Sequence, residues 1–437
     1  MAQTAESEVA RIKAQIKHPI IDMDGHWLES GAVFLEFLRE VAGPKLTDEF
    51  VASRFRDSGW YDATPEERQR KRMSRGTWWS APTNTLDFAT ASIPGLFAHR
   101  MDELGLDFTV LYPSMGLFMA GQREDLRRAC VRAYNTMVAE LFRPYRDRIA
   151  PAAVIPNNTP QDAIEEARYV VRELGLKAVV MGGTVRRETP DGRMYIDALG
   201  LDNVYDYDPV WQTFLELGVA ATSHAGSAGW PDRSSPTNFV FNHIGHFAQG
   251  NMTYCKALFM GGVPRRFPNL NFCFLEGGVA GFRWLLTEIL GHWEKRRGQA
   301  MTDWLRPSNL DVPRLSALMR EYGDERYQRH AEDIWDPFDH PGRHISPQQQ
   351  TEREPADLID EFRFVNASSK KEVAELFARN FYFGCEADDP LTTLAFDARL
   401  GVLLKACVSS DVGHWDVPHL QEVLPEMYEM RDKELLT

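Results

Sequence analysis

The chain has 437 residues and carries 49 Lys and Arg against 63 Asp and Glu, a formal net charge of −14. A hydrophobic share of 43% and a charged share of 26% are ordinary for a globular protein, which excludes a disordered or fibrous chain. The acidic balance argues against the clustered basic face of a nucleic-acid-binding protein. No run approaches 18 continuous apolar residues, so we expect no membrane span.

Cysteine usage and the first residues indicate the compartment. Five cysteines without a C-x-x-C pair are typical of reduced thiols rather than of a disulfide framework. Residues 1–17 mix acidic and basic side chains and lack the apolar centre of a signal peptide. We therefore expect a cytoplasmic protein.

Short apolar runs alternate with amphipathic helices along the chain. The predicted strands lie at 19–23, 108–112, 149–155, 177–181, 219–223, 271–275, 380–385 and 403–409. Between them, T-P-Q-D at 159–162 is typical of a helix start, and the helix after Asp208 should end at Gly218. Further helices are expected over 282–292 and 391–400.

The alternation of strands and helices predicts the fold class. Strands joined by helices pair in parallel with right-handed crossovers, and eight such units close into a (β/α)8 TIM barrel, an α/β fold. An open doubly wound sheet is the rival, but no G-x-G-x-x-G follows any strand. Two stretches, 40–98 and 297–378, exceed what connections require. We interpret them as pocket-side lid or oligomer-contact insertions in a single domain spanning 1–437.

Metal-capable side chains stand at the ends of four predicted strands, where barrel enzymes build their sites. Asp24 and His26 follow the first strand, and residues two apart share one side of a strand. His224 follows the fifth strand, Glu276 the sixth and Asp411 the eighth. Each residue alone is more often a structural cap or hydrogen-bonding group. Together they predict a divalent cation with an open position for water or substrate.

Four motifs carry a resemblance to a known family. They are I-D-M-D-G-H-W-L-E, S-H-A-G, R-R-F-P-N-L-N-F-C-F-L-E-G-G-V-A-G-F-R-W and S-D-V-G-H-W-D. Over 22–416 the chain resembles the amidohydrolase superfamily, in the family 2 branch of metal-dependent decarboxylases and hydrolases related to aminocarboxymuconate-semialdehyde decarboxylase. The resemblance implies a metal-dependent barrel enzyme.

The resemblance also assigns metal ligands, with two departures from the family pattern. The family's H-x-H after the first strand is D-x-H here, so Asp24 stands in place of the first histidine and His26 matches the second. His224 and Asp411 match the fifth-strand histidine and the eighth-strand aspartate. Glu276 replaces the sixth-strand histidine, as in a subgroup with D-x-D-x-H and L-E-G-G.

Exchanging two imidazoles for carboxylates makes the predicted site harder and more anionic. Zinc is the first expectation, with manganese or iron as alternatives. A two-metal site with a bridging carboxylate is a further alternative. However, no lysine follows the fourth strand, where binuclear branches carry a carboxylated lysine; Lys177 lies at that strand's start. We therefore favour one bound ion.

Further residues are candidates for the pocket. His243 and His246 are spaced by three, which predicts one shared helical face; they would shuttle protons, orient substrate or simply pack. We assign His243 a catalytic role and His246 a substrate-binding role. His414, which resembles the histidine of the family's S-D-x-P-H, is the other catalytic candidate beside Asp411. Glu29 is either a helix-start carboxylate or a partner of the metal shell.

The insertions hold the remaining candidates. Trp78 and Trp79 either anchor a lid or contact substrate, and we assign them a substrate-binding role. His330, His340 and His344 are interpreted as surface residues.

The favoured function is metal-assisted hydrolysis of an acyl bond (amide, ester, lactone, thioester or carbon–carbon) in a bulky hydrophobic or aromatic small molecule. Water activated by the metal would lose its proton to Asp411, and His414 or His243 would protonate the leaving group. The first alternative, implied by the resemblance, is non-oxidative decarboxylation of an aromatic or unsaturated carboxylic acid. The second is a non-catalytic binding barrel. We expect a homodimer without nucleic-acid or membrane partners.

Overall fold

The structure is a computed structural model. It describes residues 2–56, 59–76, 81–116, 119, 123–224, 233–306, 309, 311–332 and 358–436. Four candidates of the sequence, Trp78, Trp79, His340 and His344, lie outside the described residues.

The chain forms two compact units. One consists of Met1–Leu285 with Ala374–Thr437, and the other is Leu286–Val373. The second unit overlaps the predicted insertion 297–378. Roles for both insertions as lids or oligomer contacts, and a single domain over the whole chain, stay predictions.

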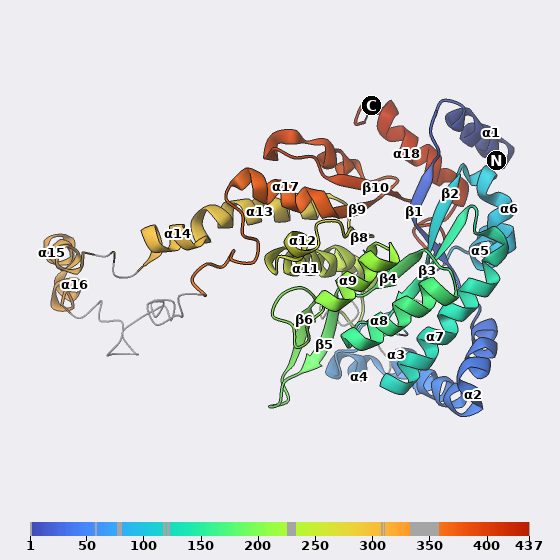
Figure 1. The fold of residues 1–437 in the computed structure, drawn as a ribbon, viewed down its shortest axis with the longest axis horizontal. Coiled ribbons are helices and arrows are strands. Elements are labelled where there is room, and N and C mark those ends of the chain that lie inside the picture. Colours follow the sequence, from blue (N-terminus) through green and yellow to red (C-terminus); the bar gives the residue numbers. More distant parts are fainter. Residues whose placement is uncertain are drawn as a thin grey trace. The chain divides into compact units, whose positions relative to one another are not determined.

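Eight parallel strands build the first unit, in the order β1-β2-β3-β4-β7-β8-β9-β10. Their bounds are β1 (Ile21–Trp27), β2 (Phe108–Pro113), β3 (Ile149–Ile155), β4 (Ala178–Met181), β7 (Ala221–Ser223), β8 (Phe272–Phe274), β9 (Phe381–Glu386) and β10 (Lys405–Ser409). Each predicted strand coincides with one of them. Helices surround the strands (Figure 1). The predicted (β/α)8 barrel is therefore confirmed, and the alternative of an open doubly wound sheet is not.

The helices that connect and flank the strands begin and end largely where the sequence signals fall. The Thr159 side chain accepts a hydrogen bond from the Asp162 amide and caps the helix that follows, as the T-P-Q-D motif predicts. The bounds are α1 (Ala2–Lys13), α2 (Gly31–Arg56), α3 (Gly59–Asp62), α4 (Pro65–Arg70), α5 (Thr85–Ser92), α6 (Pro94–Leu104), α7 (Glu124–Leu141), α8 (Pro160–Arg168), α9 (Asp208–Leu217), α10 (Phe239–His243), α11 (His246–Met260), α12 (Val263–Arg266), α13 (Ala280–Arg296), α14 (Gly298–Ala300), α15 (Val312–Tyr322), α16 (Glu325–Arg329), α17 (Lys370–Asn380) and α18 (Val423–Asp432).

Two local predictions differ from the structure. The expected α-helix over 391–400 is two short 3-10 segments, Pro390–Phe396 and Ala398–Leu400, because Asp397 is extended between them and caps the second with its side chain. In addition, the hairpin of β5 (Thr184–Glu188) and β6 (Met194–Ala198) was not expected. Its turn contains P-D-G, a turn signal that could have revealed it.

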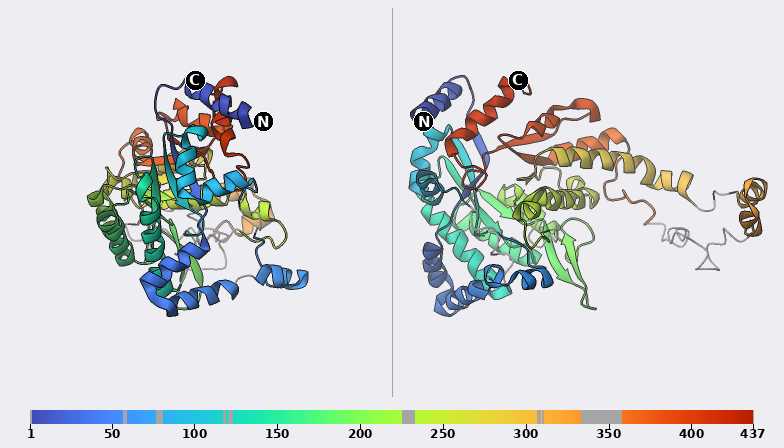
Figure 2. Two further views of the ribbon diagram at one scale, coloured as in Figure 1. Left: turned by 90° about the vertical axis from the view of Figure 1, so that its right-hand side faces the viewer. Right: turned by 180° about the vertical axis from the view of Figure 1, so that it is seen from behind.

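Alternation along the strands separates the barrel interior from the helix layer. The rings of Phe272 and Phe274 in β8 pack on Trp211 of α9 and Phe282 of α13, at centroid distances of 5.4 and 5.3 Å. Cys273 between them therefore faces into the barrel. The chain ends lie side by side where α1 packs along α18, as all three views show (Figures 1 and 2).

Among the described helices, none is long and apolar enough to cross a bilayer.

Candidate metal centre

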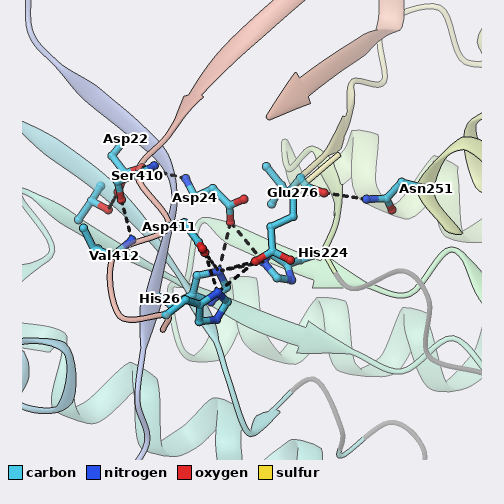
Figure 3. Close-up of polar contacts among 12 residues, drawn as sticks. Asp22, Asp24, His26, His224, Asn251, Glu276, Ser410, Asp411 and Val412 are labelled. Atoms are coloured by element: carbon cyan, nitrogen blue, oxygen red, sulfur yellow. Dashed lines mark hydrogen bonds and ion pairs between the residues drawn. The ribbon is translucent and has the colours of Figure 1, made fainter. Parts of the chain in front are cut away.

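Side chains from four strand ends converge in one buried cluster (Figure 3). Asp24 and His26 belong to β1, His224 follows β7, and Glu276 and Asp411 follow β8 and β10. The Nε2 atoms of His26 and His224 are 2.9 Å apart. Asp24 Oδ1 lies 3.8 Å from the former nitrogen and 3.6 Å from the latter. The structure therefore brings together all five residues predicted as ligands.

The ligand atoms form two overlapping groups. Asp24, His26 and His224 form one, while His26 also belongs to a second group with Glu276, Asp411 and His414; within each group the atoms lie within 4.8 Å of one another. Because the two groups share one imidazole, the cluster is continuous. Either group could hold an ion, so the number of bound ions, one or two, stays a prediction.

Backbone strain accompanies two of these residues. Glu276 and Asp411 both have φ of +50°, in the left-handed region that costs a residue with a Cβ roughly 1–2 kcal/mol. Each stands just beyond its strand, where the turn aims the carboxylate back into the barrel mouth. Such strain persists only where the surroundings impose it and gathers at functional sites.

The cluster contains buried carboxylate oxygens without hydrogen-bond partners, which suits the binding of a cation. The Asp24 side chain is wholly buried, and neither carboxylate oxygen has a hydrogen-bond partner. Burial, reinforced by the charges of Glu276 and Asp411, raises the pKa of Asp24 well above its usual range. Burial likewise lowers the pKa of His26 far below its usual value, which leaves a neutral imidazole able to bind metal. A divalent cation would neutralise the carboxylates and satisfy their unpaired atoms.

His414 completes the cluster as a charged partner of its acids. Its Nδ1 lies 2.7 Å from Asp411 Oδ1 and 3.1 Å from Glu276 Oε1, and its ring stacks on His26 at 3.6 Å. Burial alone would lower the pKa of His414, but the two carboxylates raise it well above its usual value. The side chain is 22% exposed, so this imidazolium can meet a ligand, as its predicted place in the pocket requires.

The histidines predicted to share a helical face do not share one. α10 ends at His243 and α11 begins at His246, because Gly245 between them adopts φ of +72°. This correction could have been anticipated from the glycine in H-I-G-H. Neither histidine belongs to the groups of ligand atoms.

Three rings that the sequence analysis did not place together, those of His243, Phe247 and Trp415, lie beside the cluster and are called the aromatic wall. The His243 ring is 5.4 Å from that of Phe247 and 5.6 Å from that of Trp415, and burial lowers the pKa of His243. The Phe247 ring lies 6.1 Å from the His224 ring, which links the wall to the candidate ligands. His246 is buried, with its ring 5.5 Å from the ring of Phe247.

The Glu29 side chain forms hydrogen bonds with the loop after β2. Its carboxylate accepts hydrogen bonds from the backbone amides of Met115 and Gly116, at 2.8 and 3.0 Å, in the loop after β2. Burial raises its pKa to about 7 despite these bonds. Glu29 therefore joins the end of β1 to the next loop along the barrel rim.

Asn251 on α11 plays a similar part between two other strand ends, and it also escaped prediction. Its oxygen accepts a hydrogen bond from the Ser223 hydroxyl at 2.9 Å. Its amide nitrogen donates to the Leu275 carbonyl at 2.8 Å, beside Glu276 (Figure 3). These two residues directly precede His224 and Glu276. Asn251 therefore fixes the spacing between two candidate ligands.

Comparison with known proteins identifies the family of the chain. The family model described as amidohydrolase matches residues 21–328, most of the chain, and the protein belongs to the amidohydrolase family. Its relatives include 2-amino-3-carboxymuconate-6-semialdehyde decarboxylase of Dictyostelium discoideum, with 26% identity over 177 residues. That match covers 40% of this chain and 45% of the relative, so the chain spans less than half of this curated relative's length.

Several solved structures are also similar to this chain. An amidohydrolase from Mycobacterium avium subsp. paratuberculosis K-10 has a TM-score of 0.46 and 16% identity, covering 79% of this chain and 70% of that one. The 2,6-dihydroxybenzoate decarboxylase from Rhizobium has a TM-score of 0.45 and 15% identity, covering 94% and 91%. A dihydroxybenzoic acid decarboxylase from Polaromonas sp. JS666 with bound manganese and the inhibitor 2-nitroresorcinol has a TM-score of 0.47 and 15% identity, covering 94% and 90%.

Proposed function

We propose that the chain is a metal-dependent decarboxylase that removes carbon dioxide, without oxidation, from an aromatic or unsaturated carboxylic acid. The observation that carries the proposal is the position of His414, whose Nδ1 lies within hydrogen-bonding distance of Asp411 and Glu276 and whose ring stacks on the candidate ligand His26. The decarboxylase activity of the curated relative supports this reaction over the hydrolysis that the sequence first favoured.

Asp24, His26, His224 and Asp411 would hold the ion. Two imidazoles and two carboxylates suit zinc, manganese or iron. The ion would supply positive charge that binds and polarises oxygen atoms of the substrate. Glu276 stays charged in this scheme: burial alone would raise its pKa, but the imidazoles of His224 and His414 hold it well below the usual range.

His414 is the proton donor in this proposal. The bond between the substrate carbon and its carboxylate breaks, its electron pair stays on the carbon, and carbon dioxide leaves. A proton from His414 then bonds to that carbon, and solvent returns a proton to the imidazole. Asp411 and Glu276 keep His414 protonated until this step, because their charges raise its pKa.

The aromatic wall would orient a planar substrate. Phe247 and Trp415 flank His243, and flat hydrophobic surfaces of this kind stack on aromatic or conjugated rings. The guanidinium of Arg233 lies 5.5 Å from the Phe247 ring centroid, so the wall also carries positive charge. An anionic, planar small molecule fits this combination. A homodimer and a cytoplasmic location remain part of the proposal.

Isotope tracing separates decarboxylation from hydrolysis. We would incubate the metal-loaded enzyme with hydroxybenzoic acids and unsaturated dicarboxylic acids, and separately with their esters and amides, once in D2O and once in 18O-labelled water. Decarboxylation predicts one carbon dioxide per product, one deuterium on the carbon that carried the carboxylate, and no 18O in the organic product. Product acids containing 18O, formed without carbon dioxide, would show the hydrolase instead.

A pair of histidine variants tests the proton donor. His414→Gln should lower turnover by about 100-fold to 10,000-fold, the usual contribution of a positioned acid. The matched control is His292→Gln, because the His292 side chain is 63% exposed on α13; it should keep wild-type turnover. Equal rates for both variants would remove His414 from the mechanism.

A further inference from the structure

The barrel closes at a seam between its first and last strands, and that seam runs through the candidate ligands. Among the described residues, no ladder of pairs joins β1 to β10. Instead the Asp411 amide donates to the Asp24 carbonyl and the His26 amide to the Val412 carbonyl, each at 2.9 Å. The backbone that bridges the seam therefore belongs to the ligands or to their neighbours.

One buried carboxylate fastens this seam. Asp22 Oδ1 accepts hydrogen bonds from the backbone amides of Asp24 and Ser410, at 3.1 and 3.0 Å. Its Oδ2 accepts from the hydroxyls of Thr109 and Ser410, at 2.6 and 2.9 Å. The four bonds tie β1 to β2 and to the residue that precedes Asp411 (Figure 3). Asp22 is fully buried, so no bulk water competes for these donors.

The surrounding chain is shaped to this carboxylate. The register between β1 and β2 shifts between Asp22 and Gly25, and a Cβ on Gly25 would stand 2.7 Å from Asp22 Oδ2. Only glycine leaves room there for the carboxylate. The Ser410 hydroxyl also accepts a hydrogen bond from the Val412 amide at 3.3 Å, so both sides of the strained Asp411 are fixed through Ser410.

We infer that Asp22 is a positioning residue that sets the spacing of Asp24 and Asp411 for the metal. The inference rests on the metal centre of the proposed function. Without the Asp22 carboxylate, two buried backbone amides lose their acceptor, and Asp411 loses the anchor that keeps its backbone in the left-handed region. The two acidic ligands then no longer hold one geometry, and affinity for the ion falls.

The test is calorimetric titration of Mn2+ into metal-free full-length protein, which needs no substrate. Asp22→Ala should weaken binding by about 10-fold to 100-fold, the usual effect of removing a group that orients a ligand. Thr109→Val removes one hydroxyl donor and should weaken binding roughly threefold to tenfold, the equivalent of one hydrogen bond. Ser410→Ala removes both the donor to Asp22 and the acceptor of the Val412 amide, so it should weaken binding at least as much. Thr109→Ser keeps the donor and should bind as the wild type does.

Asp87→Asn is the matched control for general destabilisation. Asp87 is also a buried aspartate, but it pairs with Arg100 at 2.8 Å, and its other oxygen accepts from the Leu420 amide. We expect this variant to lower the unfolding midpoint while its Mn2+ affinity stays at the wild-type value. If Asp87→Asn loses as much Mn2+ affinity as Asp22→Ala does, the loss comes from general destabilisation of the fold, and the inference is wrong.

The remaining outcomes separate the inference from the proposed function. Wild-type protein that binds no divalent ion would overturn the metal centre itself. Wild-type binding with unchanged affinity in Asp22→Ala would overturn the inference alone. If Asp22→Ala fails to fold, the Thr109 pair decides: a weaker Thr109→Val beside a normal Thr109→Ser supports the inference, and equal affinities refute it.

Discussion

Replacing Asp411 by asparagine should abolish turnover while the barrel stays folded. Asp411 Oδ1 lies 2.7 Å from His414 Nδ1 and 3.2 Å from His26 Nε2, so the carboxylate serves both the proton donor and the candidate metal. The amide carries no charge to keep His414 protonated. We expect turnover to fall by about 100-fold to 10,000-fold, which corresponds to roughly 3–5 kcal/mol of transition-state stabilisation.

The same variant should not lose stability in the metal-free protein. Asparagine tolerates the left-handed backbone of Asp411 better than most residues. Burial raises the pKa of Asp411 well above its usual range, with Glu276 adding to this shift against the opposing effect of His414. Because burial disfavours the charged form of this carboxylate, a neutral amide in its place avoids that cost, and the metal-free unfolding midpoint should stay level or rise.

The assay combines carbon dioxide release, metal content and thermal unfolding, with Asp202→Asn as the control. Asp202 has φ of +54° and is exposed in a bend of the chain, so the same chemical change in the same backbone region should leave turnover unaltered. Turnover of Asp411→Asn within about threefold of the wild type would refute its assigned role. A collapse in metal-free stability would refute the electrostatic reasoning.

Three further predictions concern stability and the metal. Burial raises the pKa of Glu29 from 4.5 to about 7. The contribution of this side chain to stability is therefore fully present below pH 4.5 and is lost as the pH rises through 7, by at most about 3 kcal/mol. Denaturant titrations should show the free energy of unfolding falling over this pH range in the wild type and changing less in Glu29→Gln. Asn251→Ala should weaken Mn2+ binding by about 10-fold to 100-fold, since it releases the residues before His224 and Glu276; unchanged affinity in calorimetry would contradict this. Removing the metal by chelation should lower the unfolding midpoint, and an ion at 100 times its Kd should restore about 2.7 kcal/mol; scanning calorimetry that shows no shift would speak against a bound ion.

Strand positions and strand-end residues were readable from the sequence because they depend on local pattern. Alternation and apolar runs locate the eight strands, and a parallel barrel places all their carboxyl ends at one rim. That single geometric fact brings Asp24 and Asp411 together although they are far apart in sequence. The predicted cluster follows from topology and needs no knowledge of side-chain conformation.

The features that the sequence did not reveal depend on tertiary contacts. Asp22 has the same residue type and side of the strand as Asp24, and only its four hydrogen-bond partners separate a positioning carboxylate from a ligand. Asn251 lies in an ordinary helix. Phe247 contacts His243 of α10 and His224 after β7, and the sequence does not show which residues meet in this way. The spacing of His243 and His246 alone does not show that one helix ends and another begins at Gly245.

Elemental analysis of the purified and reconstituted protein tests the central claim most directly. The account predicts about one divalent ion per chain in the wild type, and little or none after His26→Ala and His224→Ala are combined in one folded variant. Wild-type protein that carries no stoichiometric metal, as purified and after incubation with Zn2+, Mn2+ and Fe2+, would contradict it.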